Sequence, residues 1–346
     1  MKILVTGGSG FIASHIISLL LKEGHHVITT VRDLNDKEKT RHLEDLAKGN
    51  NYSLDFFEAD LLQEGSFKAP MEDCDIVIHT ASPFKISGIK DAKKQLIDPA
   101  VKGTQNVLNA VNQTRSVKKV VLTSSVAAIH GDNADIQDIK EDKFNEDHWN
   151  SSSSETHQAY SYSKAEAEKT AWQIANEQQR WKLAVINPGF VIGPSLTKRK
   201  DSTSINFMIS FLTGEFKLGV PELYFGIVDV RDVARAHVNA ALNENAEGRY
   251  IMVSETKNTV DMAKILQTHL GNSYPIPKKK LPKTMLYLAG PFAGFSRKFI
   301  RRNIGIPVYF DNSRSQNHLN IQFTPVEKAL KEQADQVIQD GLIKKN

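Results

Sequence analysis

Cysteine is almost absent from this chain of 346 residues, in which Cys74 is the single example. One cysteine excludes an intrachain disulfide and is typical of a protein that works in a reducing compartment, so we expect a cytoplasmic location. The 11 histidines include neither an HExxH pair nor a Cys/His ligand spacing. The sequence therefore predicts no bound metal.

Long hydrophobic runs are missing as well. The longest, 16–21 and 285–295, fall short of the roughly 18 to 20 residues that a membrane-spanning helix needs. The apolar run near the N-terminus is too short for a secretory signal. We therefore expect a soluble protein with no membrane partner. The composition, 40% hydrophobic and 24% charged, is ordinary for a globular protein and excludes a disordered chain.

Acidic residues are absent from one basic segment. Residues 278–302 hold eight Lys and Arg, so the segment carries +8 within a chain of net charge +4, and the rest of the chain carries −4. A charge run of this kind is most often a solvated face. No recognisable nucleic-acid-binding module accompanies it, so we expect no nucleic-acid partner.

The first half of the chain alternates between short buried strands and helices. Apolar spacing predicts strands at 2–6, 26–31, 54–57, 75–79, 119–123 and 183–187. It predicts helices at 11–22, 38–47, 99–112 and 159–178, and three later ones at 231–242, 259–270 and 326–339. This alternation predicts an α/β fold with a doubly wound parallel sheet, the Rossmann arrangement.

The pattern weakens after Pro188-Gly189, which suggests a division of the chain. Residues 1–190 are predicted to form mainly an NADP-binding Rossmann domain that also carries the catalytic residues. Residues 191–346 are predicted to form mainly a smaller α/β substrate lobe. Strand and helix segments near 227–242 are expected to return to the first domain.

The clearest binding motif follows the first strand, in the run Thr6-Gly7-Gly8-Ser9-Gly10-Phe11-Ile12-Ala13. Gly7 permits a tight turn, and Gly10 lets a pyrophosphate approach the backbone. The helix that begins in this run offers its unpaired N–H groups and the positive end of its dipole to the phosphates. A glycine-rich turn alone is weak evidence, but its place between a strand and a helix favours a dinucleotide site.

The end of the second strand indicates which dinucleotide binds. Arg32 stands 22 residues after Gly10, where an NAD site usually has an acidic residue for the ribose hydroxyls. Arginine favours a 2′-phosphate there, which predicts NADP(H) as the cofactor. Lys37 and Lys39 are candidates for a second phosphate contact or plain exposed lysines. Asp60-Leu61, after the third strand, suits an adenine contact, although aspartate is also common in turns.

Tyr160 and Lys164 stand four residues apart at the start of a predicted helix, so they lie on one helix face. A tyrosine with a pKa near 10 is a poor proton donor unless a neighbouring cation eases formation of its phenolate, as Lys164 can. The same spacing recurs in Tyr274 and Lys278, but the two prolines between them forbid a helix. Context therefore selects Tyr160.

Ser125 lies just after the strand 119–123, at the sheet edge where open α/β proteins bind ligands. Its hydroxyl could hold a carbonyl oxygen. Ser124 is an adjacent competitor, and the residues alone do not choose between the two serines.

Together, these motifs resemble the extended short-chain dehydrogenase/reductases. More narrowly, the chain is similar to the dihydroflavonol reductase-like branch, which includes plant flavonoid and cinnamoyl-CoA reductases and fungal methylglyoxal/isovaleraldehyde reductases. The narrower resemblance rests on the runs 30–33, 79–83, 101–104, 228–234 and 323–325. It covers essentially the whole chain.

The resemblance implies an NADPH-dependent reductase of aldehydes and ketones, with a small-molecule carbonyl substrate. It implies that Ser125 is the catalytic serine, that Tyr160 is the general acid, and that Lys164 lowers the pKa of Tyr160 and binds the nicotinamide ribose. The cofactor-binding residues expected from the turn and the resemblance are Gly7, Gly10, Phe11, Ile12, Arg32, Lys39, Asp60, Leu61, Thr80, Ala81, Ser82, Tyr160, Lys164, Pro188, Val191 and Ser204. We expect a monomer or a homodimer.

One departure from the family bears on the substrate. Five residues after the catalytic serine the plant flavonoid enzymes carry Asn or Asp, whereas this chain has His130, so we expect small or medium apolar carbonyl compounds rather than flavonoids. The expected substrate pocket is Phe84, Ile86, His130, Phe190 and Tyr224. Each of the four aromatic and aliphatic side chains is more often plain core, and His130 is either a pocket residue or a polar residue that opens the loop 131–158. An NDP-sugar epimerase or dehydratase shares the Tyr-x-x-x-Lys pair and is one alternative. A non-enzymatic NADP-binding sensor is another, but such a sensor lacks that pair.

Overall fold

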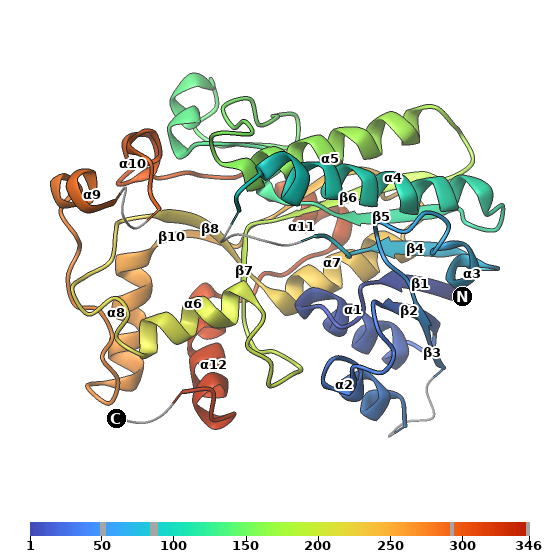
Figure 1. The fold of residues 1–346 in the computed structure, drawn as a ribbon, viewed down its shortest axis with the longest axis horizontal. Helices are drawn as coiled ribbons and strands as arrows, with labels where there is room; N and C mark the ends of the chain where they lie inside the picture. Colours follow the sequence, from blue (N-terminus) through green and yellow to red (C-terminus); the bar gives the residue numbers. More distant parts are fainter. Residues whose placement is uncertain (49–52, 84–88, 291–293, 344–346) are drawn as a thin grey trace.

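The computed structural model describes residues 1–48, 53–83, 89–290 and 294–343. Within these residues, seven strands form one parallel sheet in the order β3-β2-β1-β4-β5-β6-β9 (Figure 1). They are β1 (Lys2–Thr6), β2 (His26–Val31), β3 (Leu54–Glu58), β4 (Ile76–His79), β5 (Lys119–Thr123), β6 (Lys182–Pro188) and β9 (Gly248–Met252). The predicted doubly wound α/β fold is confirmed.

Helices cover both faces of this sheet, which is why central strands such as β1, β4 and β6 carry apolar side chains on both faces. Side chains alternate between the faces, so Ile3 and Val5 of β1 pack with helices α1 (Phe11–Lys22) and α7 (Val230–Leu242). Leu4 between them packs on the other face, with α4 (Asp98–Gln113) and α5 (Ala159–Asn176) (Figure 1). Helices α2 (Lys37–Lys48) and α3 (Lys68–Met71) complete this part.

The rest of the chain builds a second lobe around a small sheet of order β10-β8-β7. Its strands are β7 (Phe190–Ile192), β8 (Tyr224–Asp229) and β10 (Glu255–Asn258). Helices α6 (Thr203–Leu212), α8 (Thr259–Leu270) and α12 (Val326–Gln339) share one apolar core with it. In the described residues, the short helices after α8 are α9 (Lys283–Ala289), α10 (Arg297–Asn303) and α11 (Ser313–Leu319), the last of which packs against α7 and β9.

The backbone between β6 and β7 passes very close to β8 where the chain leaves the large sheet for the small one. A Cβ on Gly189 would lie 2.2 Å from the carbonyl oxygen of Gly226, a distance that no side chain tolerates. Glycine at 189 therefore lets β7 leave the end of β6 and run beside β8.

The segment near 227–242 divides between the two sheets. Its helix α7 packs against α1 under the large sheet, whereas its strand β8 pairs with β7 and β10 in the small sheet. The strand that does return to the large sheet is β9, which pairs with β6 and was not predicted. In this part of the chain, α7 and β9 therefore lie with the large sheet and β8 lies in the small sheet.

Cys74 lies two residues before the start of β4 and is completely buried. Burial raises the pKa of its thiol to about 12, and its Sγ lies 3.5 Å from the carbonyl oxygen of Pro70. In the described part of the chain, no helix combines the length and apolar composition that a bilayer crossing requires.

Candidate active site

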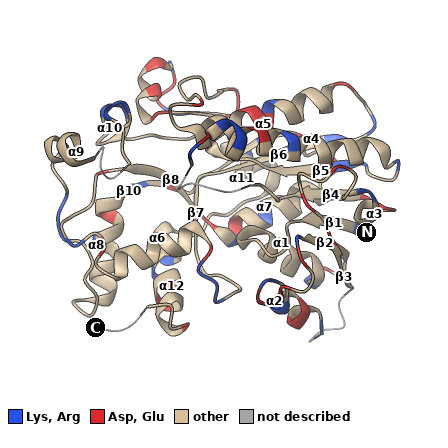
Figure 2. Cartoon of the chain, viewed as in Figure 1, with Lys and Arg blue, Asp and Glu red and all other residues tan. Residues whose placement is uncertain are grey.

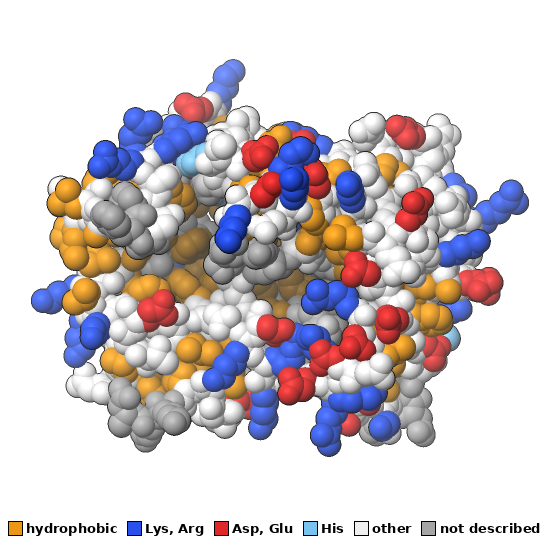
Figure 3. Space-filling model, in the orientation of Figure 1, with side chains coloured by type: hydrophobic (Ala, Val, Ile, Leu, Met, Phe, Trp, Pro, Cys, Tyr) orange, Lys and Arg blue, Asp and Glu red, His pale blue; other side chains and the backbone are white. Residues whose placement is uncertain are grey.

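One large cavity lies at the carboxyl ends of the central strands, against the second lobe. Its volume is about 650 Å³, within the usual range for ligand pockets. The turn after β1, the ends of β5 and β6 and the start of α5 form one side, and residues of α6, β8 and α10 form the other. Figure 3 shows the molecular surface hollowed between the two lobes, with apolar side chains gathered in the hollow.

The turn between β1 and α1 forms one end of the cavity. Gly7 has a φ of +69°, and a Cβ there would lie 3.0 Å from Ala81, so both backbone conformation and space favour glycine. Helix α1 starts at Phe11, and its N-cap residue, Gly10, makes no side-chain cap. The first N–H groups and the positive end of the helix dipole therefore suit an anion. This turn fits the pyrophosphate of a dinucleotide.

Most of the predicted cofactor residues line this cavity, namely Gly7, Gly10, Phe11, Ile12, Thr80, Ser82, Tyr160, Lys164, Pro188, Val191 and Ser204. Leu61 and Ala81 line a much smaller cavity beside it, together with Ser82 and Lys164. Arg32, Lys39 and Asp60 line neither of the two.

These last three residues lie beyond the cavity, near the carboxyl ends of β2 and β3. Arg32 is exposed directly after β2. Lys39 places its Nζ 2.5 Å from a carboxylate oxygen of Asp36, and this contact lowers the pKa of Asp36. Asp60 accepts a hydrogen bond from the backbone N–H of Leu62 at 2.7 Å, which is ordinary turn chemistry.

The second lobe adds a cation that our sequence reasoning missed. Arg199 lies in the segment between β7 and α6, lines the cavity, and donates from Nη1 to the carbonyl oxygen of Ser9 at 3.0 Å. It also pairs with Asp201. Burial and the charge of Arg199 lower the pKa of His42 to about 4. Figure 2 shows the basic residues of this segment on the same side of the molecule as α2.

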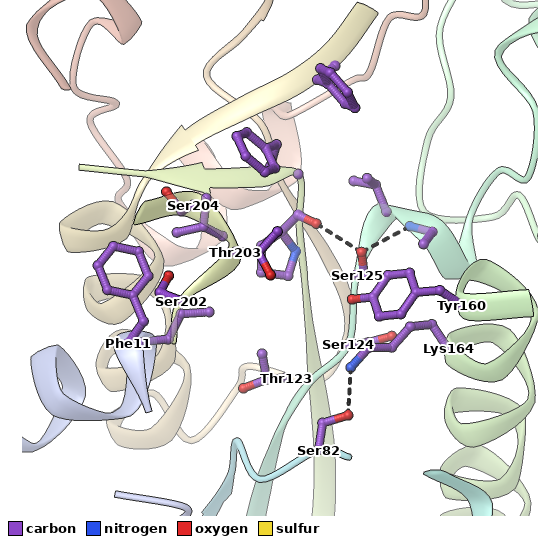
Figure 4. Close-up of a pocket in the computed structure, with 18 of the residues that line it drawn as sticks. Phe11, Ser82, Thr123, Ser124, Ser125, Tyr160, Lys164, Ser202, Thr203 and Ser204 are labelled. Atoms are coloured by element: carbon purple, nitrogen blue, oxygen red, sulfur yellow. Dashed lines mark hydrogen bonds between the residues drawn. The ribbon is translucent and has the colours of Figure 1, made fainter. Parts of the chain in front are cut away.

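The catalytic candidates meet in the middle of the cavity. Tyr160 and Lys164 lie one turn apart on α5, with the Lys164 Nζ 5.9 Å from the centre of the tyrosine ring. Ser125 follows β5, accepts from the N–H of Ala127 at 3.1 Å and donates to the carbonyl oxygen of Pro188 at 3.4 Å. Figure 4 shows these three side chains directed into the same space.

Burial shifts the acidities of the tyrosine and lysine in opposite directions. It raises the pKa of Tyr160 to about 12 and lowers the pKa of Lys164 to about 8, although the Glu168 carboxylate partly opposes the second shift. The Lys164 Nζ donates to the hydroxyl of Ser82 at 3.1 Å. At neutral pH Lys164 is therefore still mostly protonated and places a positive charge beside Tyr160.

The two candidate serines have different surroundings. Ser124 is buried and donates to Glu168 at 2.5 Å. Glu168 also accepts from Asn187 at 2.8 Å and from Arg249 at 2.6 Å, so Ser124 belongs to a buried network behind Lys164. Ser125 is half-buried, and its hydroxyl is the one that caps the short helix after β5.

The far end of the cavity is apolar. Its walls include Val126, Phe190, Tyr224, Phe225, Phe299 and Val308. His130 lines it as well, with its ring stacked on Phe144 at a centroid distance of 5.2 Å, and burial lowers the pKa of His130 to about 4. Its ring is therefore neutral at physiological pH. Phe84 and Ile86 lie outside the described residues.

The chain is similar to proteins of known activity. The model of the NAD dependent epimerase/dehydratase family matches residues 3–253. The chain is 35% identical to cinnamoyl-CoA reductase CAD2 of Medicago truncatula, over 95% of this chain and 93% of that protein. It is 33% identical to the NADPH-dependent methylglyoxal reductase GRE2 of Saccharomyces cerevisiae, over 98% of each chain. Among solved structures, yeast methylglyoxal/isovaleraldehyde reductase Gre2 complexed with NADPH superimposes with a TM-score of 0.80 at 30% identity, covering 98% of each chain.

Proposed function

This chain belongs to the NAD dependent epimerase/dehydratase family, and from that premise we propose that it is an NADPH-dependent reductase of aldehydes and ketones. The observation that carries the proposal is a single cavity with a glycine-rich turn at one end, an apolar wall at the other, and Ser125, Tyr160 and Lys164 between them. The relatives named above are reductases, and one of them uses NADPH.

The residues around the turn fit NADPH, which supplies a hydride to the carbonyl carbon when bound. The start of α1 takes the pyrophosphate, and Lys164 binds the nicotinamide ribose. Arg32 and Lys39 are the proposed partners of the 2′-phosphate, because an acidic residue after β2 would repel it. Arg199 adds a phosphate contact from the second lobe, since it already reaches the backbone of the turn.

In the chemical step, Tyr160 donates its proton to the carbonyl oxygen while the hydroxyl of Ser125 holds that oxygen by a hydrogen bond. A tyrosine whose pKa is raised to about 12 by burial is a weak acid, so the phenolate left behind needs a cation. Lys164 supplies that cation below its pKa of about 8.

The proposed substrates are small or medium apolar aldehydes and ketones. The apolar walls of the far end suit them, and His130 is packed in an aromatic cluster with Phe144 and Phe310. A polyphenol ring would bring several hydroxyl groups to this end, and a buried polar group without a partner costs about 1 to 3 kcal/mol.

Two other activities fit less well. Epimerases share the family and the Tyr-x-x-x-Lys pair, but the relatives at 33% to 35% identity are reductases, and Arg32 stands where an NAD site has an acid. A sensor without catalysis would have no need of Tyr160 and Lys164 in one cavity.

Oxidation of NADPH in the presence of a panel of carbonyl compounds tests the proposal. We expect turnover with aliphatic and aromatic aldehydes and ketones, with a higher kcat/KM for these than for dihydroquercetin. A higher value for the flavonoid would reverse the substrate assignment. Conversion of a UDP-sugar with no NADPH oxidation by any carbonyl compound would reject the reductase itself.

A further inference from the structure

The basic segment 278–302 is not only a solvated face, because one of its cations makes contacts inside the protein. Most of its cations are exposed, but Arg302 is half-buried at the end of α10. Its Nε lies 2.6 Å from Asp132 and its Nη2 lies 2.6 Å from Asp135, two acids that stand 170 and 167 residues earlier in the chain. The second lobe thus reaches into the loop that follows β5.

Asp132 is the centre of this contact and is completely buried. Its carboxylate accepts from Arg302, from the Nδ2 of Asn303 at 2.7 Å and from the Nε2 of His157 at 3.0 Å. Burial alone would raise the pKa of Asp132, but the hydrogen bonds from these three side chains outweigh it and lower the pKa. An ionised carboxylate in this position needs the charge of Arg302, because a buried charge without a partner is strongly unfavourable.

The same carboxylate holds the residues that lead into the catalytic helix. His157 and Gln158 directly precede α5, and the Nε2 of Gln158 donates to Asp132 at 2.6 Å. Gln158 has a φ of +54°, a left-handed conformation that is unfavourable for a residue with a side chain. The surrounding contacts therefore fix a strained turn two residues before Tyr160.

Helix α10 also forms part of the wall of the apolar end of the cavity, through Phe299 and Asn303. Asn303 accepts from the backbone N–H of Asn133 at 3.0 Å, and Asn133 donates in turn to the carbonyl oxygen of Ile306 at 3.0 Å. One short helix thus contacts both the cavity and the loop that carries Asp132.

We propose that Arg302 and Asp132 are positioning residues, through which the second lobe holds the start of α5 and so places the hydroxyl of Tyr160 against the carbonyl oxygen. Neither residue touches the reacting atoms. The proposal rests on the reductase function proposed above. It gives part of the basic segment a role in catalysis that requires no acidic binding partner outside this chain.

Arg302→Gln tests the proposal, with Arg301→Gln as a matched control because Arg301 is an exposed neighbour on the same helix. We expect Arg302→Gln to lower kcat by about tenfold to a hundredfold, the effect of a small misplacement of a catalytic group. The KM for the carbonyl compound and the Kd for NADPH should change little. Arg302→Lys should restore part of the loss, because it returns the charge without the forked geometry.

A second measurement separates positioning from a general loss of stability and does not depend on activity. Amide hydrogen exchange should become faster at residues 157–164 in Arg302→Gln and stay unchanged in Arg301→Gln. Asp132→Asn keeps the shape of the side chain and should give the same local change in exchange. It replaces Arg302→Gln in this experiment if Arg302→Gln folds poorly.

Wild-type kcat or unchanged exchange at 157–164 in a folded Arg302→Gln would overturn the proposal. Faster exchange spread evenly over both lobes would also overturn it, because that result means a purely structural contact. A wild-type protein that reduces no carbonyl compound refutes the proposed function instead, while the exchange experiment still decides whether Arg302 holds the start of α5.

Discussion

The two ends of the proposed NADPH site, the catalytic residues inside the cavity and the phosphate end beyond it at the ends of β2 and β3, are built in opposite ways. Behind the catalytic residues, Glu168 lies in a buried network in which it accepts from Ser124, Asn187 and Arg249. At the phosphate end, Arg32 and Lys39 lie near the surface, and Lys39 pairs with a partly exposed acid. On the proposed function, the catalytic end is organised before any ligand arrives, as electrostatic catalysis requires, whereas the phosphate end would be completed by the ligand.

The largest expected effect lies at the organised end. Tyr160→Phe removes the proposed acid and should lower kcat by about 10² to 10⁴-fold, with the Kd for NADPH nearly unchanged. NADPH oxidation and NADPH fluorescence measure the two quantities. Tyr274→Phe is the control, since Tyr274 lies in the core of the second lobe and should be almost silent. Near-normal turnover by Tyr160→Phe would remove Tyr160 from the mechanism.

The buried network should also carry a large share of stability. Glu168→Ala leaves Arg249 buried without its charge partner, which should lower the free energy of unfolding by about 3 to 5 kcal/mol. Glu166→Ala, two residues earlier on α5, breaks only the partly exposed pair with Lys169 and should cost about 0 to 1 kcal/mol. Urea denaturation of both variants measures the contrast, and equal losses would contradict it.

At the phosphate end, the expected effect is on cofactor choice. Hydrogen bonds to charged groups contribute about 1.5 to 3 kcal/mol, so Arg32 should favour NADPH over NADH by roughly ten to a hundred and fifty fold. Arg32→Asp should remove this preference and leave NADH binding unchanged or improved. Added salt should weaken NADPH binding by the wild type more than by the variant. Equal affinity of the wild type for the two cofactors would make Arg32 an ordinary surface residue.

The pH dependence of kcat should report Lys164. As the pH rises through about 8, Lys164 loses its charge and kcat should fall by about tenfold per pH unit. Deprotonation of Lys164 should not itself unfold the protein, because the pKa of Lys164 is lower in the folded state than in the unfolded chain. Between that pKa and the ordinary value of 10.5 the unfolded chain binds more protons, so this residue makes the free energy of unfolding rise with pH. Loss of activity together with loss of folded protein would contradict this assignment.

The smallest effect concerns Arg199, which reaches from the second lobe to the backbone of the glycine-rich turn. Arg199→Ala should weaken NADPH binding by about two- to tenfold, because a partly exposed phosphate contact is worth about 0.5 to 1.5 kcal/mol. Lys200→Ala removes the same charge from an exposed neighbour and is the control. Identical affinities for the two variants would show that only the total charge of the segment matters.

Features that lie within one helix or strand could be predicted from the sequence, whereas features that depend on a distant partner could not. Tyr160 and Lys164 could be placed on one helix face because a spacing of four fixes their relative geometry. Strands such as β1 and β4 could be predicted because each consists mainly of consecutive apolar residues. Strand β9 was missed because it contains Arg249, a buried charge whose carboxylate partner, Glu168, lies on α5. No local pattern reveals such a partner.

Arg199 and Arg302 were missed for a related reason. Their contacts join residues about 170 to 190 positions apart, and nothing in the spacing of either segment marks them. The interpretation of 278–302 as a solvated face describes Arg297 and Lys298, which are exposed, but not Arg302. The relative positions of residues on one helix or strand can be predicted from their spacing in the sequence. Contacts between residues of two lobes become visible only in the folded structure.

The buried thiol of Cys74 makes this protein convenient for labelling experiments. With its pKa raised to about 12 and no exposed surface, this thiol should resist maleimide reagents in the folded protein. Cysteines introduced at exposed positions on each lobe, such as Lys118→Cys and Lys298→Cys, would then be the only reactive sites. A pair of fluorophores at these positions would measure whether the distance between the lobes changes when NADPH is added, without first removing a native cysteine.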